Sequence, residues 1–231
     1  MGDRDTVVDA DQVSYRYSAH PALREVSFTI TSGTLVSLVG GNGSGKSTLL
    51  ALIAGVLAPD AGSLICRNRS RPAIAFQRSM NSDELPLTVH ECVMLGRFGP
   101  HRLIRRMTGV DRRTVDDFIE KLGIGHLARK QLRDLSGGQR QRTLIAQALA
   151  QQSDLLLLDE PTAALDADGQ KVVDELLREQ TNAGTTVIQA THRAQDAADS
   201  DQVLELAGGC LIQSSAAGPR SGDDRMAGLR L

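Results

Sequence analysis

The sequence is poor in cysteine, and its cysteines are not grouped. Only Cys66, Cys92 and Cys210 are present, and no two of them form a C-x-x-C pair. A disulfide framework and a cysteine-rich metal site both require cysteines at short, regular spacings. The five histidines are equally dispersed. We therefore expect the cysteines to be packing residues, and we expect most of the histidines to have structural or surface roles.

Long apolar runs are also absent. The longest apolar stretches, residues 48–57 and 155–158, are much shorter than the roughly 20 apolar residues of a membrane-spanning helix. Residues 1–13 are acidic and contain no basic segment followed by an apolar run, so a secretory signal is not expected. These absences predict a cytoplasmic protein, which depends on a partner for any work at a membrane.

A basic excess is missing as well. The formal net charge is −2 and the isoelectric point is near 6.2, which gives no electrostatic reason to expect binding to nucleic acid. The sequence has no internal repeat and no sustained heptad pattern. Its 231 residues, with ordinary fractions of apolar and charged side chains, predict one compact domain with a buried core.

Short apolar runs alternate with segments of helical periodicity. The strands predicted from these runs lie at residues 35–39, 73–76, 155–158 and 185–190. The predicted helices lie at residues 48–57, 89–95, 114–122, 138–150 and 167–180. Such alternation is typical of an α/β protein with a parallel sheet.

The domain organisation follows from where this alternation changes. We place a single domain at residues 1–213, with a helical insertion at about residues 78–138, and a flexible C-terminal tail at residues 214–231, which lack periodicity. Arginines in the insertion could lie near anionic lipid headgroups or on a solvated helical face. They are Arg97, Arg102, Arg105, Arg106, Arg112 and Arg113.

A glycine-rich segment between the first of these predicted strands and the following helix has the pattern G-x-x-x-x-G-K-[ST]. Its glycines allow backbone N–H groups to surround an anion, and the helix adds the positive end of its dipole. Lys46 can reach the β and γ phosphates, and the Ser47 hydroxyl can coordinate Mg²⁺. The pattern predicts a nucleoside triphosphate as ligand. The predicted nucleotide-binding residues are Gly40, Gly41, Asn42, Gly43, Ser44, Gly45, Lys46, Ser47 and Thr48.

Two adjacent carboxylates end the apolar strand at residues 155–158. Asp159 and Glu160 have no packing reason to follow a buried strand, whereas open α/β sheets present ligand-binding groups at this end of a strand. Asp159 is suited to hold Mg²⁺, often through water, and Glu160 is suited to polarise the water that attacks the γ phosphate. The alternative, a solvated acidic loop, is plausible only without the phosphate loop upstream.

A second glycine-rich segment precedes the predicted helix at residues 138–150. Ser136, Gly137, Gly138 and Gln139 place a hydroxyl and flexible amides at a positive helix end. If the first loop holds the one nucleotide of the domain, this second anion site has no ligand within the same domain. The second site gains a role if it covers ATP bound to another copy, so that two chains facing head to tail bury two ATP molecules.

These motifs together resemble the ABC ATPase family, over about residues 13–206. In that family the second motif is the signature segment, which is donated across the dimer. The resemblance implies an α/β P-loop NTPase fold with a mostly parallel core sheet, an antiparallel β subdomain and an α-helical insertion subdomain. ATP and Mg²⁺ are the implied cofactors.

The resemblance also assigns residues outside the two glycine-rich segments. Tyr17 resembles the aromatic residue that stacks on adenine, although Tyr15 could be a simple strand residue. Gln77 resembles the Q-loop glutamine, which senses Mg²⁺ and water and connects to the membrane partner. Asp166 belongs to a D-loop that crosses the dimer interface, and His192 resembles the switch histidine on the γ phosphate. Catalytic roles are thus expected for Lys46, Gln77, Glu160 and His192, and metal ligation for Ser47, Gln77 and Asp159.

Two features depart from the family pattern. The phosphate loop has Gly41 where many relatives carry proline or serine, and the segment from Lys46 to Gln77 is short. Neither departure removes a catalytic group, but the short segment leaves little chain for the antiparallel strands that support the adenine.

Residues 85–89, 94–97 and 136–142 resemble bacterial zinc or manganese importer ATPases of the AztA type. The expected partners are a second copy of the chain, transmembrane permease subunits and, indirectly, an extracytoplasmic solute-binding protein, at the cytoplasmic face of the membrane. An iron-siderophore importer is the nearest alternative cargo class. A soluble, non-transport ABC ATPase is less favoured, because the chain has a single ATPase unit and no strong basic excess. A small-molecule kinase is also less favoured, because the signature segment and Glu160 serve hydrolysis in a dimer and not transfer to a bound acceptor.

Overall fold

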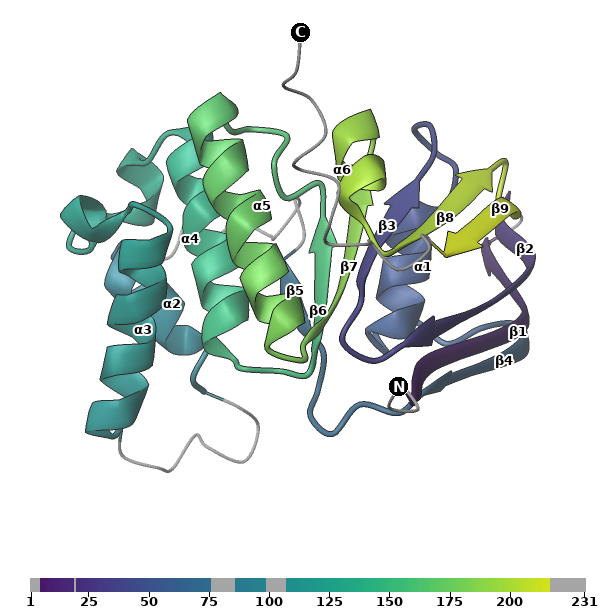
Figure 1. Cartoon of the computed structure of the whole chain (residues 1–231), viewed down its shortest axis with the longest axis horizontal. Helices are drawn as coiled ribbons and strands as arrows, with labels where there is room; N and C mark the ends of the chain where they lie inside the picture. The colour runs from purple at the N-terminus through teal and green to yellow at the C-terminus, as the bar shows by residue number, and fades with distance from the viewer. Residues whose placement is uncertain (1–4, 19, 76–85, 99–106, 217–231) are drawn as a thin grey trace, which may run out of the picture.

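The computed structural model describes residues 5–18, 20–75, 86–98 and 107–216 as an α/β fold with two sheets (Figure 1). The larger sheet has six strands in the order β5-β6-β7-β3-β8-β9. All its neighbouring strands pair in parallel except β8 and β9. The strands are β3 (Leu35–Val39), β5 (Ala73–Ala75), β6 (Leu155–Asp159), β7 (Thr186–Thr191), β8 (Gln202–Ala207) and β9 (Cys210–Ala216). The predicted, mostly parallel core sheet is confirmed.

The smaller sheet is antiparallel, with the order β2-β1-β4. Its strands are β1 (Thr6–Tyr17), β2 (His20–Thr31) and β4 (Ala61–Cys66). The short segment after the phosphate loop is therefore long enough for a supporting strand, since β4 pairs along β1 from Val8↔Cys66 to Ser14↔Ala61. The antiparallel β subdomain implied by the family resemblance is present.

The helices cover both faces of the core sheet. They are α1 (Lys46–Ile53), α2 (Val89–Leu95), α3 (Gly109–Lys121), α4 (Gly137–Ala150), α5 (Ala167–Asn182) and α6 (Ala194–Asp199), with 3-10 turns at Gly125–Leu127 and Leu132–Asp134. In Figure 1, α4 and α5 lie on one side of β6, α2 and α3 pack outside α4, and α1 lies on the other side, toward the antiparallel sheet.

The position of β6 between two layers of the core explains why its sequence is apolar throughout. Leu156 and Leu158 pack into the cluster formed with the helical insertion and α4, while Leu155 and Leu157 pack into the cluster that includes α1 and the antiparallel sheet. All four leucines are buried. A parallel strand covered on both faces has no solvent side, so every position favours an apolar residue until the strand ends at Asp159.

The predicted helical insertion contains α2 and α3, and each begins with a capping box. Thr88 caps α2 with Glu91, and Thr108 caps α3 with Asp111. The helix α3 begins five residues before the predicted start at residue 114, because the Thr108 cap precedes the apolar periodicity that indicated the helix. The predicted bounds of α2, residues 89–95, are confirmed, and its start directly follows the cap at Thr88.

Arg97 is neither on a solvated face nor near a lipid surface, in contrast to both interpretations of the basic stretch. Its side chain is only 7% exposed and forms an ion pair with Asp111. Nη1 also donates to the Ala150 carbonyl at 2.6 Å and to Gln152 Oε1 at 2.9 Å. Arg112 and Arg113 are exposed, and residues 102, 105 and 106 lie outside the described residues.

The boundary of the predicted C-terminal tail also needs correction. Residues 214–216 belong to β9, whose Ser214 and Ala216 pair with Leu204 and Gln202 of β8. Pairing with β8 satisfies the backbone of this polar segment although it has no apolar periodicity. Residues 217–231 lie outside the described residues.

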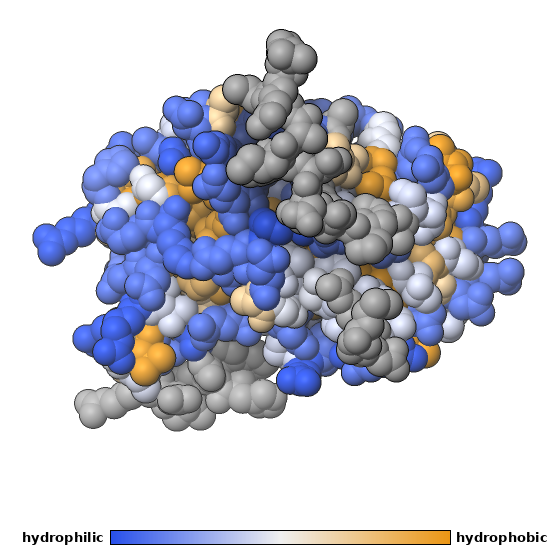
Figure 2. All heavy atoms as spheres, in the orientation of Figure 1, coloured by the Kyte–Doolittle hydropathy of each residue, from blue (hydrophilic) through white to orange (hydrophobic). Residues whose placement is uncertain are grey.

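The surface drawn in Figure 2 is mainly hydrophilic, with apolar residues in small, separate patches. Among the described residues, no helix combines the length and the apolar character needed to cross a bilayer.

Candidate nucleotide-binding site

Three neighbouring strands of the core sheet bring the predicted site together. β6, β7 and β3 are adjacent and parallel, so their carboxyl ends meet at one edge of the sheet. The phosphate loop follows β3, the carboxylates of Asp159 and Glu160 end β6, and His192 follows β7. Segments that are more than a hundred residues apart in the sequence are thus neighbours in space.

The phosphate loop presents donors that have no partner within the described structure. The helix α1 begins at Lys46 after Gly45, and no side chain caps it. Ser44 Oγ is buried without a hydrogen-bond partner in the part of the chain that the structure describes. The backbone N–H groups that likewise lack an acceptor among described residues are those of Gly43, Gly45, Lys46, Ser47 and Thr48. Such a cluster of donors at a positive helix end fits the phosphates of a nucleotide.

Gly45 cannot be replaced without moving its surroundings. Its φ is +107°, and a Cβ on this residue would lie 2.6 Å from Leu23 Cδ2 and 2.8 Å from the Ala22 carbonyl oxygen. The strand β2 therefore presses directly against the end of the phosphate loop. Gly41 differs, because a Cβ there would meet no atom within 4 Å. The loop has space for the side chains that many relatives carry at that position.

Lys46 closes the loop on itself. Its Nζ donates to the carbonyl oxygens of Gly40 at 2.7 Å and Gly41 at 3.0 Å, and the residue is buried. An ammonium group has three donors, so one N–H remains for a phosphate oxygen. The Lys46 ammonium group is therefore already held inside the loop, where it can offset the negative charge of the predicted triphosphate.

Ser47 and Asp159 form the contact that joins the two predicted motifs. The Ser47 hydroxyl donates to Asp159 Oδ2 at 2.7 Å. Burial raises the pKa of Asp159, and the neighbouring Glu160 carboxylate raises it further, while the Ser47 hydrogen bond and Lys46 act in the opposite direction. Hydroxyl and carboxylate oxygens side by side are the donor set that Mg²⁺ prefers, so these residues fit the predicted ion.

Glu160 has a strained backbone next to the predicted reaction centre. Its φ is +49°, which is uncommon for a residue with a side chain. Its N–H donates to the Ala190 carbonyl of β7 at 2.9 Å, which helps to hold this conformation. Glu160 Oε1 lies 3.5 Å from His192 Nδ1, and the Glu160 side chain is 19% exposed while that of His192 is 62% exposed. The two predicted catalytic side chains thus face each other.

The predicted signature segment is the N-terminus of α4. Ser136 is the N-cap: its Oγ accepts from the Gln139 N–H at 3.3 Å, and Gln139 Oε1 accepts from the Ser136 N–H at 3.1 Å. A Cβ on Gly138 would lie 2.8 Å from the Ala164 carbonyl oxygen, so the predicted D-loop packs against this glycine. Asp166 caps α5, where its Oδ1 accepts from the Gly169 N–H at 3.0 Å. Contacts across a dimer remain a prediction for these residues.

Two predicted residues remain, Tyr17 and Gln77. Tyr17 is the last residue of β1 and is 51% exposed. Its ring packs edge-on against Tyr15, with centroids 4.9 Å apart. Stacking on adenine remains a prediction. Gln77 lies outside the described residues.

The structure also places two residues beside the site that the sequence did not single out. Arg193, directly after His192, donates from Nη1 to Thr162 Oγ1 at 2.9 Å. Thr162 lies two residues after Glu160 and is buried. A charged residue two positions after a fully buried strand is the only sequence signal for Arg193. Its partners depend on tertiary packing.

Comparison with known proteins identifies relatives of the chain. The family model described as "ABC transporter" matches residues 23–163. The chain is 37% identical to the chelated iron transport system membrane protein YfeB of Yersinia pestis over 80% of the chain and 65% of that protein. It is also 37% identical to the manganese transport system ATP-binding protein MntA of Synechocystis over 81% of the chain and 75% of the relative. The zinc transport system ATP-binding protein TroB of Treponema pallidum is 34% identical over 86% of the chain and 77% of its own length.

Solved structures have the same fold. A putative metal-chelate type ABC transporter in an inward-facing conformation matches with a TM-score of 0.77 and 29% identity, over 91% of this chain and 83% of that one. The ATP-binding cassette MJ0796, solved as a dimer in a post-hydrolysis state with ADP and phosphate, matches with a TM-score of 0.78 and 28% identity, over 90% and 98% of the two chains.

Proposed function

Because the chain belongs to the ABC transporter family, we propose that it is the ATP-binding subunit of an importer for a metal ion, zinc or manganese. Hydrolysis of ATP in a head-to-tail dimer of this chain powers the uptake. One observation carries the catalytic part of the proposal: the hydrogen bond between Ser47 and Asp159 joins the phosphate loop to the acidic strand end, next to the facing pair of Glu160 and His192.

The phosphate loop binds the triphosphate. Its unpartnered N–H groups and the buried Ser44 hydroxyl donate to phosphate oxygens, and Lys46 supplies the remaining N–H of its ammonium group. Tyr17 stacks on the adenine from the end of β1. Most of this geometry is already formed, so little ordering of the loop is needed on binding.

Ser47 and Asp159 hold Mg²⁺, together with Gln77. The ion, when bound, neutralises negative charge on the phosphate oxygens. Asp159 is suited to this role because its carboxylate is half-buried and oriented by the Ser47 hydroxyl. Both side chains come from secondary structure, β6 and α1, which keeps their oxygens in place.

Glu160 orients the attacking water and accepts its proton. His192, within 3.5 Å of the Glu160 carboxylate, contacts the γ phosphate and keeps the carboxylate directed at the water. Ser136, Gly137, Gly138 and Gln139 of a second copy cover the other side of the triphosphate, and Asp166 lies at the interface. Closure of the dimer on ATP and its opening after hydrolysis provide the movement.

The cargo class is supported by the relatives. YfeB, MntA and TroB are named for chelated iron, manganese and zinc transport. The importer has transmembrane permease subunits and an extracytoplasmic solute-binding protein, and it places this chain at the cytoplasmic face of the membrane. An importer for an iron chelate is the second candidate, favoured by YfeB and by the metal-chelate type transporter structure.

The catalytic part is tested with the purified chain, ATP and Mg²⁺. Wild-type protein should release phosphate without an added acceptor, whereas Glu160→Gln should bind ATP, lose hydrolysis and elute as a dimer in ATP and Mg²⁺. His192→Ala should also lose hydrolysis but retain ATP binding. A Glu160→Gln protein that stays monomeric with ATP and hydrolyses it at the wild-type rate overturns the assignment.

The cargo is tested in vesicles that contain the chain with its permease and binding protein. ATP-dependent accumulation of labelled zinc or manganese supports the proposal, and accumulation of an iron chelate alone supports the second candidate. Vesicles with the Glu160→Gln chain serve as the control for uptake that does not depend on hydrolysis.

A further inference from the structure

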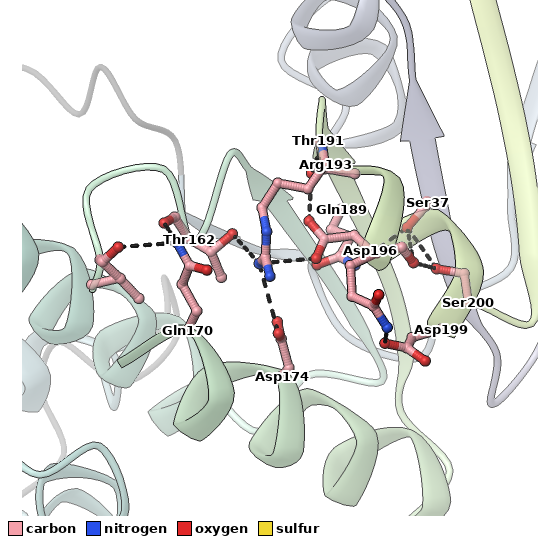
Figure 3. Close-up of polar contacts among 12 residues, drawn as sticks. Ser37, Thr162, Gln170, Asp174, Gln189, Thr191, Arg193, Asp196, Asp199 and Ser200 are labelled. Carbon is pink, nitrogen blue, oxygen red and sulfur yellow. Dashed lines mark hydrogen bonds and ion pairs between the residues drawn. The ribbon is translucent and has the colours of Figure 1, made fainter. Parts of the chain in front are cut away.

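Arg193 lies at the centre of a polar network behind the site (Figure 3). One nitrogen, Nη1, makes three contacts: with Thr162 Oγ1 at 2.9 Å, with Asp196 Oδ1 at 3.0 Å and with Asp174 Oδ2 at 3.6 Å. In Figure 3 the guanidinium group points between the loop of Thr162, the helix α5 with Asp174 and the start of α6. A single side chain thus contacts three separate elements.

The network is largely buried and rich in negative charge. The side chain of Arg193 is 23% exposed, and that of Asp196 is 2% exposed. Burial raises the pKa of Asp174 to about 6, and the carboxylates of Asp196 and Asp199 add to this while Arg193 opposes it. The guanidinium charge therefore has a defined position, because two carboxylates attract it to the same place.

The contacts of Arg193 connect the two predicted catalytic segments. His192 is its neighbour in the chain, and Thr162 is two residues after Glu160. The turn around His192 is held by local bonds: Thr191 Oγ1 accepts from the Arg193 N–H at 3.0 Å and donates to Asp196 Oδ2. The His192 side chain itself is mostly exposed, and Glu160 is its only polar partner among the described residues. Its position therefore depends on the turn.

We propose that Arg193 is a positioning residue for hydrolysis: by bridging Thr162 and Asp196 it fixes the distance between Glu160 and His192, and through Asp174 it anchors both to α5. This inference rests on the proposed function, since it concerns the same site. Arg193 touches no reacting atom. It acts on the rate through the geometry of the facing carboxylate and imidazole, and misplacement by about 1 Å lowers a rate strongly.

The chain offers a matched control in Arg178. This residue is also on the α5 side of the sheet, is 30% exposed and forms an ion pair with Asp201 at 2.9 Å. Asp201 accepts from the N–H of Leu35, the first residue of β3, so this pair lies at the end of the sheet away from the phosphate loop. Loss of Arg178 removes a similar ion pair without touching Thr162 or His192.

The experiment compares Arg193→Met with Arg178→Met in steady-state hydrolysis. We expect Arg193→Met to lower kcat by about tenfold or more with KM for ATP within about twofold, since the interaction is felt in the transition state and not in binding. Arg178→Met should keep kcat within about twofold of wild type even where thermal unfolding shows a similar loss of stability.

Two milder variants keep the proposal testable if Arg193→Met, which leaves Asp196 buried without its cation, does not fold. Arg193→Lys retains the charge and three donors and should recover at least about half of the wild-type kcat. Thr162→Val keeps the shape and removes the hydroxyl, and should lower kcat about threefold. Thr162→Val added to Arg193→Met should cause no further loss, because the bond is already absent.

Three outcomes overturn the proposal: equal loss of kcat in Arg193→Met and Arg178→Met, a wild-type kcat in Thr162→Val, or a rise in KM with kcat unchanged. Glu160→Gln separates this failure from failure of the proposed function. If Glu160→Gln is inactive and Arg193→Met hydrolyses normally, only the role of Arg193 is wrong. If Glu160→Gln hydrolyses normally, the proposed function itself fails.

Discussion

The two glycine-rich helix starts, before α1 and before α4, satisfy their backbone groups in different ways. The start of α1 has no side-chain cap, and its N–H groups have no acceptor in the described part of the chain. The start of α4 is capped on both sides, because Ser136 and Gln139 bond each other's backbone. The first start is open to an anion within its own chain. The second is stable without one, which is consistent with the proposal that it covers a nucleotide bound to another copy.

A further contrast separates α4 from the other capped helices. The boxes of α2 and α3 carry an acid, Glu91 or Asp111, where α4 carries the amide of Gln139. Hydrogen bonds from Thr88 lower the pKa of Glu91, and those from Thr108 lower the pKa of Asp111, so both are ionised. These carboxylates offset the positive helix end. Gln139 completes the cap without adding charge and leaves the helix end attractive to phosphate.

Gly45→Ala should disrupt the start of α1, and we expect it to have the largest effect on stability and ATP binding. The added Cβ clashes with Leu23 and Ala22, and the φ of +107° disfavours a side chain. We expect the free energy of unfolding to fall by about 2–4 kcal/mol and ATP binding to be lost. Denaturant unfolding and binding of a non-hydrolysable ATP analogue measure this. Gly43→Ala is the control, since its φ is +75° but its Cβ meets no atom within 4 Å. Equal effects in both variants would show that backbone strain alone, and not contact with β2, sets the requirement.

Ser136→Ala should disrupt the capped start of α4 and leave the phosphate loop before α1 intact. The lost cap lowers stability by about 1 kcal/mol. If the proposed function is right, hydrolysis should fall on the order of 100-fold, because the hydroxyl would then donate to the transition state, while ATP binding by a single chain is unchanged. Thr108→Ala removes an equivalent cap from α3 and should lower stability similarly with hydrolysis retained. Loss of hydrolysis in both variants would reduce the role of Ser136 to helix stability.

Gln139→Glu sharpens the contrast between amide and acid caps. A carboxylate at this position resembles Glu91 and should raise stability by about 0.3–1 kcal/mol through the helix dipole. The same charge repels the triphosphate, so hydrolysis should fall by about tenfold and recover partly at high salt as the repulsion is screened. Rates at two ionic strengths together with denaturant unfolding test both parts. An unchanged rate at low salt contradicts the idea that the helix end must stay uncharged.

Gly41→Ala should have the smallest effect and mark the tolerant part of the phosphate loop. Its Cβ meets no atom within 4 Å, and the residue does not have a positive φ. Restriction of the unfolded chain should raise the free energy of unfolding by about 0.4–1 kcal/mol. Hydrolysis should stay within about twofold of wild type, because no donor of the loop is removed. A large loss of ATP binding would mean that the backbone at Gly41 must move when ATP binds.

The core strands and the starts of α2 and α4 could be predicted from sequence because their causes are local, whereas the predicted start of α3 was five residues too late. A strand buried on both faces is apolar throughout, and a capping residue in the sequence marks the first turn of a helix. The antiparallel strands were harder: β1 carries Asp9, Asp11 and Gln12, and shifts of register interrupt its pairing. The hairpin of β8 and β9 has a sequence signal in Gly208-Gly209, whose φ values of +56° and +82° suit a tight turn between antiparallel strands.

The candidate site divides in the same way. The phosphate loop and the acidic strand end are continuous motifs, so their residues could be named from sequence alone, whereas His192 was identified through the family resemblance. Their meeting at one sheet edge follows from strand order, which periodicity does not give. Arg193 could not be found, because Thr162 and Asp174 are distant in sequence and approach it only in the folded chain.

The buried pair of Arg97 and Asp111 has a mechanical consequence for α4. Arg97 ties the end of α2 and the start of α3 to the carbonyl of Ala150, the last residue of α4. A displacement of α2 by a neighbouring subunit would therefore move α2, α3 and α4 together as a rigid body. α4 has 14 residues, which makes it about 21 Å long. A tilt of about 5° at Ala150 would displace Ser136 by about 2 Å, roughly the margin between a formed and a broken hydrogen bond.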